Sequence, residues 1–298
     1  MKLTYATRRS ALALAQSRAF MATLTQAHGD VETIELQIVT SGDRFQDVAL
    51  QDLGGKGLFI KELEEALFDG RADLAVHSIK DVPAELAEGL TIACIPERED
   101  PRDALVSRDG KRLADLPRGA RVGTSSLRRS VCLREARPDL VIEPLRGNVD
   151  TRLRRVEEGA FDAVVLALAG LKRLGLAHRV TEALSPAVCL PAIGQGALGI
   201  ETRAGDAKAT AALSSVHHVE TAIAVAAERA LMATVGGSCR MPVAAHARRE
   251  GDRMFLDGLL ADPDGSNVRR GKRAAAWPRE ESEAAQLGSD LGRELASK

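Results

Sequence analysis

Short β-like runs alternate with helical patterns along most of the chain, and this alternation limits the possible folds more than any other feature of the sequence. Alternation of this kind is typical of α/β domains built on parallel sheets, because each helix connects strands that run in the same direction. The strands predicted in this part of the chain are Leu3–Ala6, Ile34–Val39, Leu74–His77, Arg121–Gly123, Leu140–Leu145 and Ala163–Leu168.

The intervening helices follow from apolar residues at helical spacing and from residues that start or stop helices. Ser10 is expected to cap a helix that runs through about Ala27, and Gly236-Gly237 is a helix stop. The other predicted helices are Leu58–Phe68, Leu127–Ala136, Val149–Glu158, Val219–Val235 and a final helix from Glu280 onward. Three further strands are predicted near the C-terminus, at about Val243–Ala247, Met254–Leu260 and Val268–Ala275.

The pattern restarts after a charged, proline-bearing linker at Glu97–Arg102, and the glycine-rich segment Leu190–Glu201 carries the chain back. We therefore predict an α/β protein with three domains. The first is an α/β domain at 1–98 plus about 196–216, the second an arginine-rich α/β domain at 102–193, and the third a small α+β domain at 218–298. A ligand-binding cleft is expected between the first two domains.

Composition narrows the class of protein. The 298 residues include 41 Lys and Arg against 42 Asp and Glu, so the net charge is −1, and aromatic residues make up 3%. A near-neutral charge and few stacking side chains speak against nucleic acid as a partner. The first residues lack the features of a signal peptide, and no apolar run has the length of a membrane span, so we expect a cytoplasmic location without membrane contact.

Four scattered cysteines suit a reducing compartment: Cys94, Cys132, Cys189 and Cys239. Neither they nor His217-His218 have the spacing of metal ligands, so no metal site is predicted and the two histidines are assigned to a helix start. Cys239 lies in a loop after a helix end, where a thiol is accessible. Spacing alone favours an incidental loop thiol, because no neighbouring histidine supplies a base.

Arginines concentrate between Arg118 and Arg155, where ten arginines, no lysine and four acidic residues give an excess of six positive charges. Guanidinium groups match carboxylates or phosphates with paired hydrogen bonds, whereas a lysine ammonium is a strongly hydrated point charge. The segment therefore predicts a polyanionic ligand.

The position of each arginine separates ligand binding from ordinary surface ion pairing. Four arginines stand at turns and helix starts, where the ends of strands face a ligand crevice. We expect these four to bind the anion: Arg128, Arg129, Arg146 and Arg152. Solvated helix faces are favoured for Arg134, Arg137, Arg154 and Arg155. Arg8 and Ser10 repeat the same arrangement after the first strand and join the predicted site.

A second candidate site follows the buried strand at Leu74–His77, in the segment His77-Ser78-Ile79-Lys80-Asp81-Val82-Pro83. The Asp81 carboxylate could accept N–H hydrogen bonds and stabilise developing positive charge. An Asx-type turn before proline explains the same residues equally well.

The segment Gly54-Gly55-Lys56-Gly57 invites comparison with a phosphate-binding loop, but it lacks the spacing and the Ser or Thr that such a loop requires. We reject a nucleotide site there. The long polar stretch 41–57 is instead expected to form a mobile lid.

Eight sequence motifs, spread in order along nearly the whole chain, resemble those of the porphobilinogen deaminase family. Any one of them is weak, but the ordered set is highly specific. They are Ala6-Thr7-Arg8-Arg9-Ser10, Gly54-Gly55-Lys56-Gly57-Leu58-Phe59, His77-Ser78-Ile79-Lys80-Asp81-Val82-Pro83, Gly123-Thr124-Ser125-Ser126-Leu127-Arg128-Arg129, Leu145-Arg146-Gly147-Asn148, Leu171-Lys172-Arg173-Leu174-Gly175, Gly194-Gln195-Gly196 and the Cys239 loop.

The resemblance implies a type II periplasmic-binding-protein fold for the first two domains, and a monomer. It also implies stepwise condensation of four porphobilinogen molecules to hydroxymethylbilane, with loss of ammonia. Asp81 would be catalytic, binding pyrrole N–H groups and stabilising the cation left when ammonia departs. Cys239 would hold a dipyrromethane cofactor through a thioether, with further cofactor contacts from Lys80, Asp81, Ser126, Arg128, Arg129 and Arg146. The substrate contacts would come from Arg8, Ser10, Lys56, Phe59, Arg152, Arg173 and Gln195.

Two other classes of protein share parts of this pattern. A non-catalytic solute-binding protein of the same fold would grip a polycarboxylate without a covalent adduct. A synthase or aminotransferase-like enzyme acting on phosphorylated metabolites would use the arginines but not Cys239. Detection of the covalent adduct separates both from the first interpretation.

Overall fold

The computed structural model describes residues 1–44, 60–236 and 241–297, and the chain divides into two compact units. One unit comprises Met1–Glu99 with Ala197–Ala222, and the other comprises Asp100–Gly196 with Ile223–Lys298. In the described part of the chain, no helix is long and apolar enough to cross a membrane.

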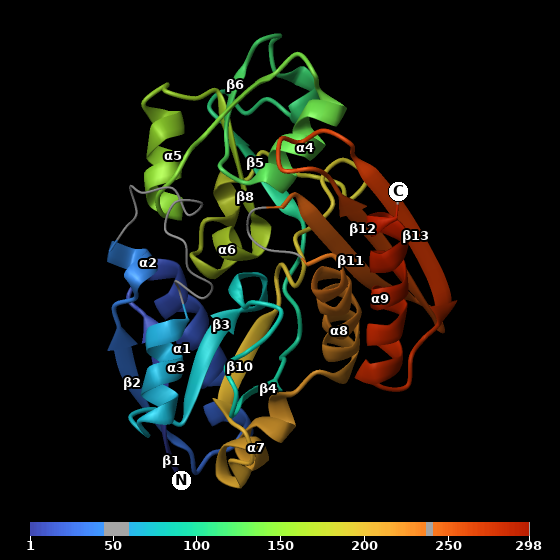
Figure 1. Cartoon of the computed structure of the whole chain (residues 1–298). Coiled ribbons are helices and arrows are strands. Elements are labelled where there is room, and N and C mark those ends of the chain that lie inside the picture. The colour runs from blue at the N-terminus through green and yellow to red at the C-terminus, as the bar shows by residue number, and fades with distance from the viewer. Residues whose placement is uncertain (45–59, 237–240, 298) are drawn as a thin grey trace. The chain divides into compact units, whose positions relative to one another are not determined.

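The first unit is built on a five-stranded sheet with helices on both faces (Figure 1). Its strands, in spatial order, are β2 (Glu32–Ile38), β1 (Lys2–Arg8), β3 (Leu74–Ser78), β10 (Leu198–Arg203) and β4 (Leu90–Cys94). The helices are α1 (Ala11–Ala27), α2 (Ser41–Arg44), α3 (Lys61–Phe68) and α7 (Ala207–Leu213), with 3₁₀ turns η1 (Ile79–Asp81) and η4 (Ser214–Val216).

The alternation of side chains along a strand separates two cores in this unit. Leu3 and Tyr5 of β1 pack in one cluster with Phe20 and Leu24 of α1. The intervening Ala6 packs in a second cluster with residues of α3. The two helices therefore cover opposite faces of the sheet.

The second unit contains another five-stranded sheet of related order. Its strands are β7 (Val141–Glu143), β6 (Arg121–Gly123), β8 (Ala163–Ala167), β5 (Asp103–Ser107) and β9 (Glu182–Ala183). The helices beside it are α4 (Leu127–Ala136), α5 (Val149–Glu157) and α6 (Leu168–Arg173), with η2 (Leu113–Asp115) and η3 (Ala177–Arg179).

Both sheets have the strand order of the type II periplasmic-binding-protein fold, and both are mixed rather than parallel. In the first sheet β10 runs antiparallel to β3 and β4, and in the second β5 runs antiparallel to β8 and β9. The expectation of parallel sheets was wrong for these two strands. Each of them follows a passage of the chain from one unit to the other, so no connecting helix sets its direction.

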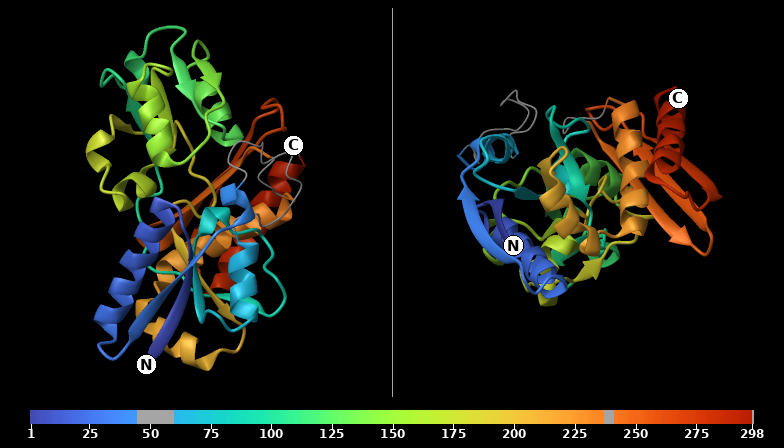
Figure 2. Two further views of the ribbon diagram at one scale, coloured as in Figure 1. Left: turned by 90° about the vertical axis from the view of Figure 1, so that its left-hand side faces the viewer. Right: turned by 90° about the horizontal axis from the view of Figure 1, so that it is seen from below.

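The second unit also holds a three-stranded antiparallel sheet, β11 (Val243–Glu250), β12 (Arg253–Leu260) and β13 (Arg269–Ala276). Helices α8 (Val219–Thr234) and α9 (Glu281–Ala296) pack beside this sheet (Figures 1 and 2). Their shared core includes Leu231, Leu256 and Leu291. This is the small C-terminal α+β region that the sequence predicts, although the domain boundaries themselves stay a prediction.

Candidate active site

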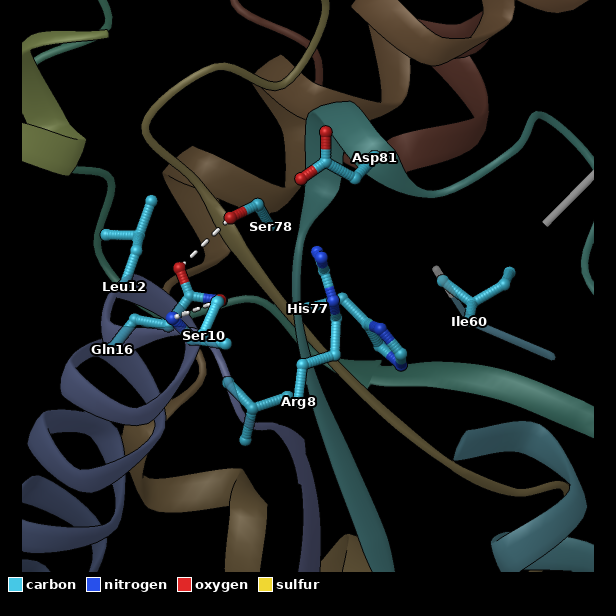
Figure 3. Close-up of a pocket in the computed structure, with 10 residues that line it drawn as sticks. Arg8, Ser10, Leu12, Gln16, Ile60, His77, Ser78 and Asp81 are labelled. Atoms are coloured by element: carbon cyan, nitrogen blue, oxygen red, sulfur yellow. Dashed lines mark hydrogen bonds between the residues drawn. The ribbon is translucent and has the colours of Figure 1, made fainter. Parts of the chain in front are cut away.

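A pocket in the first unit lies where β1 and β3 end (Figure 3). It is lined from three segments by Arg8, Ser10, Leu12, Ala13, Gln16, Ile60, Val76, His77, Ser78 and Asp81. The strands β1 and β3 are parallel neighbours, so their carboxyl ends present Arg8 and the turn after Ser78 at the same edge of the sheet. The sequence predicted Arg8, Ser10 and Asp81 as separate candidates, and the structure brings these three together.

Asp81 ends the short turn η1, which a hydrogen bond from the Val82 amide to the Ile79 carbonyl closes at 3.0 Å. Its side chain is exposed and lines the pocket, and it makes no hydrogen bond to the described part of the chain. An Asx-type turn would require a bond from this carboxylate to nearby backbone. The structure therefore disfavours the purely structural interpretation of Asp81.

The opposite wall of the pocket comes from α1. Ser10 caps this helix by accepting a hydrogen bond from the Ala13 amide at 3.3 Å, as predicted. Gln16, one turn further, is buried and accepts a hydrogen bond from the Ser78 hydroxyl at 3.0 Å (Figure 3). Gln16 was not predicted as a site residue. The available signal was a glutamine among the residues that α1 turns toward the sheet, between Ala13 and Phe20.

His77 lines the pocket and is bonded to an acid that the sequence analysis also missed. Its Nε2 lies 2.9 Å from Oε2 of Glu201, and both residues are buried. Glu201 belongs to β10. A lone acid directly after the apolar run Leu198–Ile200 was the available sign of a buried polar group.

In the second unit, Arg128 and Arg129 at the start of α4 both bond to Asp103 on β5. Arg128 Nη1 lies 2.7 Å from Oδ2, and Arg129 donates to Oδ1 from Nε and Nη2. All three residues are buried. Burial would raise the pKa of Asp103, but the two guanidinium groups hold it far below its usual value. These two arginines were predicted to bind an external anion, and the structure adds a carboxylate from the chain itself.

Two further groups converge on Asp103. Gln195 donates from Nε2 to Asp103 Oδ1 at 3.1 Å and to the Pro101 carbonyl at 2.7 Å. The Cys189 thiol donates to Asp103 Oδ2 at 3.2 Å. A hydrogen bond with Cys132, burial and the Asp103 charge raise the pKa of Cys189, so the thiol stays protonated. Asp103 is thus the centre of a buried network that ties β5 to α4 and to the segment before β10.

Positive charge is concentrated beside this network. The pKa of Arg152 is lowered to about 10, first by burial and then by the charges of Arg129 and Arg146. Arg152 donates from Nε to the Gly147 carbonyl at 2.8 Å, which orients it at the start of α5. An arginine with a lowered pKa between two others marks a position where bound carboxylates would relieve repulsion. Anion binding by the arginine-rich segment stays a prediction, and the repulsion among these three arginines supports it.

Other predicted residues have local partners. Ser126 caps α4 by accepting from the Arg129 amide at 3.4 Å, and Arg173 donates to the Gly196 carbonyl at 2.7 Å. Arg154 and Arg155 pair with Glu158 on an exposed helix face, as expected. Arg137 differs from that expectation. It is half-buried and donates to the carbonyls of Leu113, Ala114 and Leu116 as well as to Asp139.

Three predicted site residues lie outside the described residues: Lys56, Phe59 and Cys239, and so does most of the predicted lid. The other three cysteines are buried, and burial raises the pKa of Cys94 to about 12. His218 accepts a hydrogen bond from the Thr221 amide at the start of α8, so the two histidines belong to a helix start as predicted. Among the described residues, no group of three or more His, Cys, Asp or Glu could hold a metal ion.

Comparisons with known proteins identify the family of this chain. Residues 3–211 match the family model "Porphobilinogen deaminase, dipyromethane cofactor binding domain", and residues 222–297 match "Porphobilinogen deaminase, C-terminal domain". A porphobilinogen deaminase from Sorangium cellulosum is 68% identical over 99% of this chain and 98% of its own length. One from Syntrophotalea carbinolica is 50% identical over 97% and 92%.

The solved structures that match this chain are more distant in sequence. The VFT2 domain of BvgS from Bordetella pertussis is 18% identical, with a TM-score of 0.41 over 72% of this chain and 86% of that domain. A substrate-binding domain of a putative molybdenum ABC transporter from Clostridium difficile is 12% identical, with a TM-score of 0.42 over 72% and 90%.

The two mixed sheets, the pocket that Asp81 lines and the arginine cluster define an α/β protein of the type II periplasmic-binding order with a candidate site for an anion. The family models cover most of the chain, and the chain belongs to the porphobilinogen deaminase family. It is accordingly a transferase of tetrapyrrole biosynthesis with a dipyrromethane cofactor-binding domain.

Proposed function

We propose that this chain is a hydroxymethylbilane synthase with Asp81 as its catalytic residue. Four porphobilinogen molecules and one water give hydroxymethylbilane and four molecules of ammonia. In each of the four condensations a carbon–nitrogen bond of the incoming aminomethyl group breaks, ammonia leaves with the electron pair, a carbon–carbon bond forms and a proton is lost. The observation that carries the proposal is the exposed Asp81 carboxylate in a pocket with Arg8 and Ser10.

Asp81 is suited to stabilise charge rather than to attack. When ammonia leaves, the substrate pyrrole becomes cationic, and a carboxylate in the pocket lowers the energy of that charge. The same carboxylate can accept the pyrrole N–H hydrogen bond, which orients the ring. Asp81 makes no bond within the described chain that substrate would first have to displace.

Each porphobilinogen carries an acetate and a propionate, so the growing product is a polyanion. The donor set of the second unit fits such carboxylates, because the pKa of Arg152 is lowered by burial and then by the nearby charges of Arg129 and Arg146. We assign Arg152, Arg173 and Gln195 to the substrate, together with Arg8, Ser10, Lys56 and Phe59.

The dipyrromethane cofactor calls for the same chemistry. When bound through a thioether to Cys239, it supplies the pyrrole α-carbon on which the product is built. We assign its carboxylates to Lys80, Ser126, Arg128, Arg129 and Arg146, and its pyrrole N–H groups to Asp81. Arg128 and Arg129 would then bind cofactor carboxylates on one side while Asp103 holds them on the other, which fixes their orientation before the ligand arrives.

Intact-mass measurement of the purified protein tests the proposal. We expect a mass excess of two linked pyrroles, its loss in Cys239→Ala, and its retention in Ser238→Ala, a control in the same loop. The wild type should consume porphobilinogen and release one ammonia for each molecule consumed. A protein without the mass excess that leaves porphobilinogen unchanged would contradict the assignment.

We further propose that the enzyme is a cytoplasmic monomer that binds neither nucleic acid nor membrane. The net charge of −1 supports this, because it supplies no overall attraction to a polyanion. Light scattering of the eluted protein should give the mass of one chain, 31.7 kDa, plus the cofactor.

A further inference from the structure

The buried pair of His77 and Glu201 lies beneath the pocket that holds Asp81. The two residues come from neighbouring antiparallel strands, where His77 is opposite Gly199 and Glu201 is opposite Ala75. With a carboxylate as acceptor, the imidazole donates from Nε2 to Glu201 Oε2 at 2.9 Å. Glu201 is fully buried, and His77 exposes 5% of its surface, at the pocket wall.

We do not expect this pair to contribute much to the stability of the fold. The second oxygen of Glu201 is buried without a hydrogen-bond partner among the described residues, which leaves its desolvation uncompensated. A further acid, Glu64 of α3, faces the same pair, and its pKa is raised first by burial and then by the charge of Glu201. Well-packed apolar residues in place of a buried ion pair are often neutral or stabilising.

The position of the pair in the strand indicates what it does. His77 is followed directly by Ser78, whose hydroxyl is bound to Gln16 of α1. The next residue, Ile79, donates its amide to the Ala197 carbonyl at 3.0 Å. The last residues of β3 are thus fixed to β10 and to α1 just before the turn that ends at Asp81.

The packing at the start of β10 is equally close. A Cβ atom on Gly199 would lie 2.4 Å from Cδ1 of Ile79, so any larger residue at 199 would require the Ile79 side chain to shift. Three contacts therefore join Ala197 and β10 to the end of β3 and the turn after it. The Ala197 carbonyl accepts from the Ile79 amide, Gly199 packs against the Ile79 side chain, and Glu201 bonds to His77.

We propose that Glu201 is a positioning residue for the reaction, acting through His77 to hold the end of β3 and hence the Asp81 carboxylate in its working place. The proposal rests on the assignment of Asp81 under the proposed function. Glu201 itself does not line the pocket, so it acts on the reaction only through His77.

Two pairs of variants test the bond from its two sides. Glu201→Met keeps the side-chain length but removes the acceptor, whereas Glu201→Gln keeps an acceptor for the imidazole. His77→Ala removes the donor, whereas His77→Gln keeps an N–H near the place of Nε2. Thr202→Val is the control, because Thr202 is a buried neighbour on β10. Within the described residues its hydroxyl bonds only locally, to the Arg203 carbonyl.

We expect E201M and H77A to lower kcat by about tenfold to a hundredfold, because a small displacement of a catalytic group has effects of this size. KM should stay within about twofold, since the carboxylate-binding side chains are unchanged. E201Q and H77Q should recover most of kcat, and T202V should match the wild type. E201M combined with H77A should be no slower than the slower single variant, because both remove one interaction.

Two outcomes would overturn the inference while leaving the proposed function intact: E201M and H77A as active as T202V, or losses in kcat that multiply in the double variant. If E201M does not fold, H77A and H77Q decide the question by the same kcat comparison. A wild type that does not consume porphobilinogen contradicts the proposed function itself, and this inference with it.

Discussion

The guanidinium group of Arg129 donates two hydrogen bonds to a single oxygen of Asp103, from Nε at 3.0 Å and from Nη2 at 2.7 Å. The other oxygen of Asp103 accepts from Arg128 and from the Cys189 thiol. One buried carboxylate therefore fixes the two arginines at the start of α4. This arrangement fixes the orientation of both guanidinium groups.

Substitution of Asp103 should destabilise the protein strongly. Asp103→Ala leaves two buried guanidinium groups without their acid, and breaking a buried pair from one side costs about 3–5 kcal/mol. Thermal unfolding should show a large fall in Tm. Glu143→Gln is the control, because Glu143 also makes paired hydrogen bonds to an arginine, Arg121, but at the exposed surface. A similar Tm for both variants would contradict the assigned role of burial.

The same network predicts a dependence of stability on acid. The pKa of Asp103 is lowered in the folded state, so its contribution to stability is complete above the unfolded value of about 3.9 and is lost as pH falls below it. The free energy of unfolding of the wild type should fall below about pH 4. Asp103→Asn should show a weaker fall over that range, measured by denaturant unfolding at each pH. An equal fall in the free energy of unfolding of both proteins below about pH 4 would contradict the role of the Asp103 charge.

Asp81→Asn should separate turnover from binding and from stability. The amide cannot stabilise a cation as a carboxylate does, so kcat should fall by about a hundredfold to a thousandfold while KM changes little. Tm should stay close to that of the wild type, because Asp81 is exposed and makes no bond within the described chain. Glu85→Gln, an exposed acid just beyond the turn, should be fully active. Near-normal kcat in D81N would remove Asp81 from the mechanism.

Arg152→Gln should act mainly on KM. Loss of one charged hydrogen bond to a substrate carboxylate corresponds to about tenfold or more in affinity. Arg154→Gln on the same helix is the matched control, since Arg154 faces away and pairs with Glu158. Steady-state kinetics with porphobilinogen would distinguish the two. Equal KM values for both variants would place Arg152 outside the substrate site.

Gly199→Ala should destabilise the first unit by about 1–3 kcal/mol, as overpacking of a core does. The added methyl group would meet Cδ1 of Ile79 at 2.4 Å. Ile79→Val removes that carbon, so the double variant should recover part of the Tm loss. Gly29→Ala should leave Tm unchanged, because nothing lies within 4 Å of its Cβ position. A G199A protein with the Tm of the wild type would show that the strands separate easily.

Local patterns were enough to predict many elements of the fold. The helix predicted at Leu127–Ala136 is found with those bounds, and Ser10 caps α1 as expected. Caps and apolar spacing act within a few residues, so the sequence carries that information directly. By contrast, β4, β5 and the helices α6 and α7 were not predicted. They are short, and their sequences lack the periodicity that distinguishes a strand from a helix.

The sequence by itself determined the family, through an ordered set of motifs. It also predicted a site for a polyanion in the arginine-rich segment and a carboxylate after a buried strand. Only the tertiary structure decided which groups meet. It placed Asp103 against Arg128 and Arg129, and Glu201 against His77, over separations of 25, 26 and 124 residues. It also set the antiparallel direction of β5 and β10. These outcomes depend on how the chain passes between its two units and on the pairing of buried charges, and neither is encoded in any short window of residues.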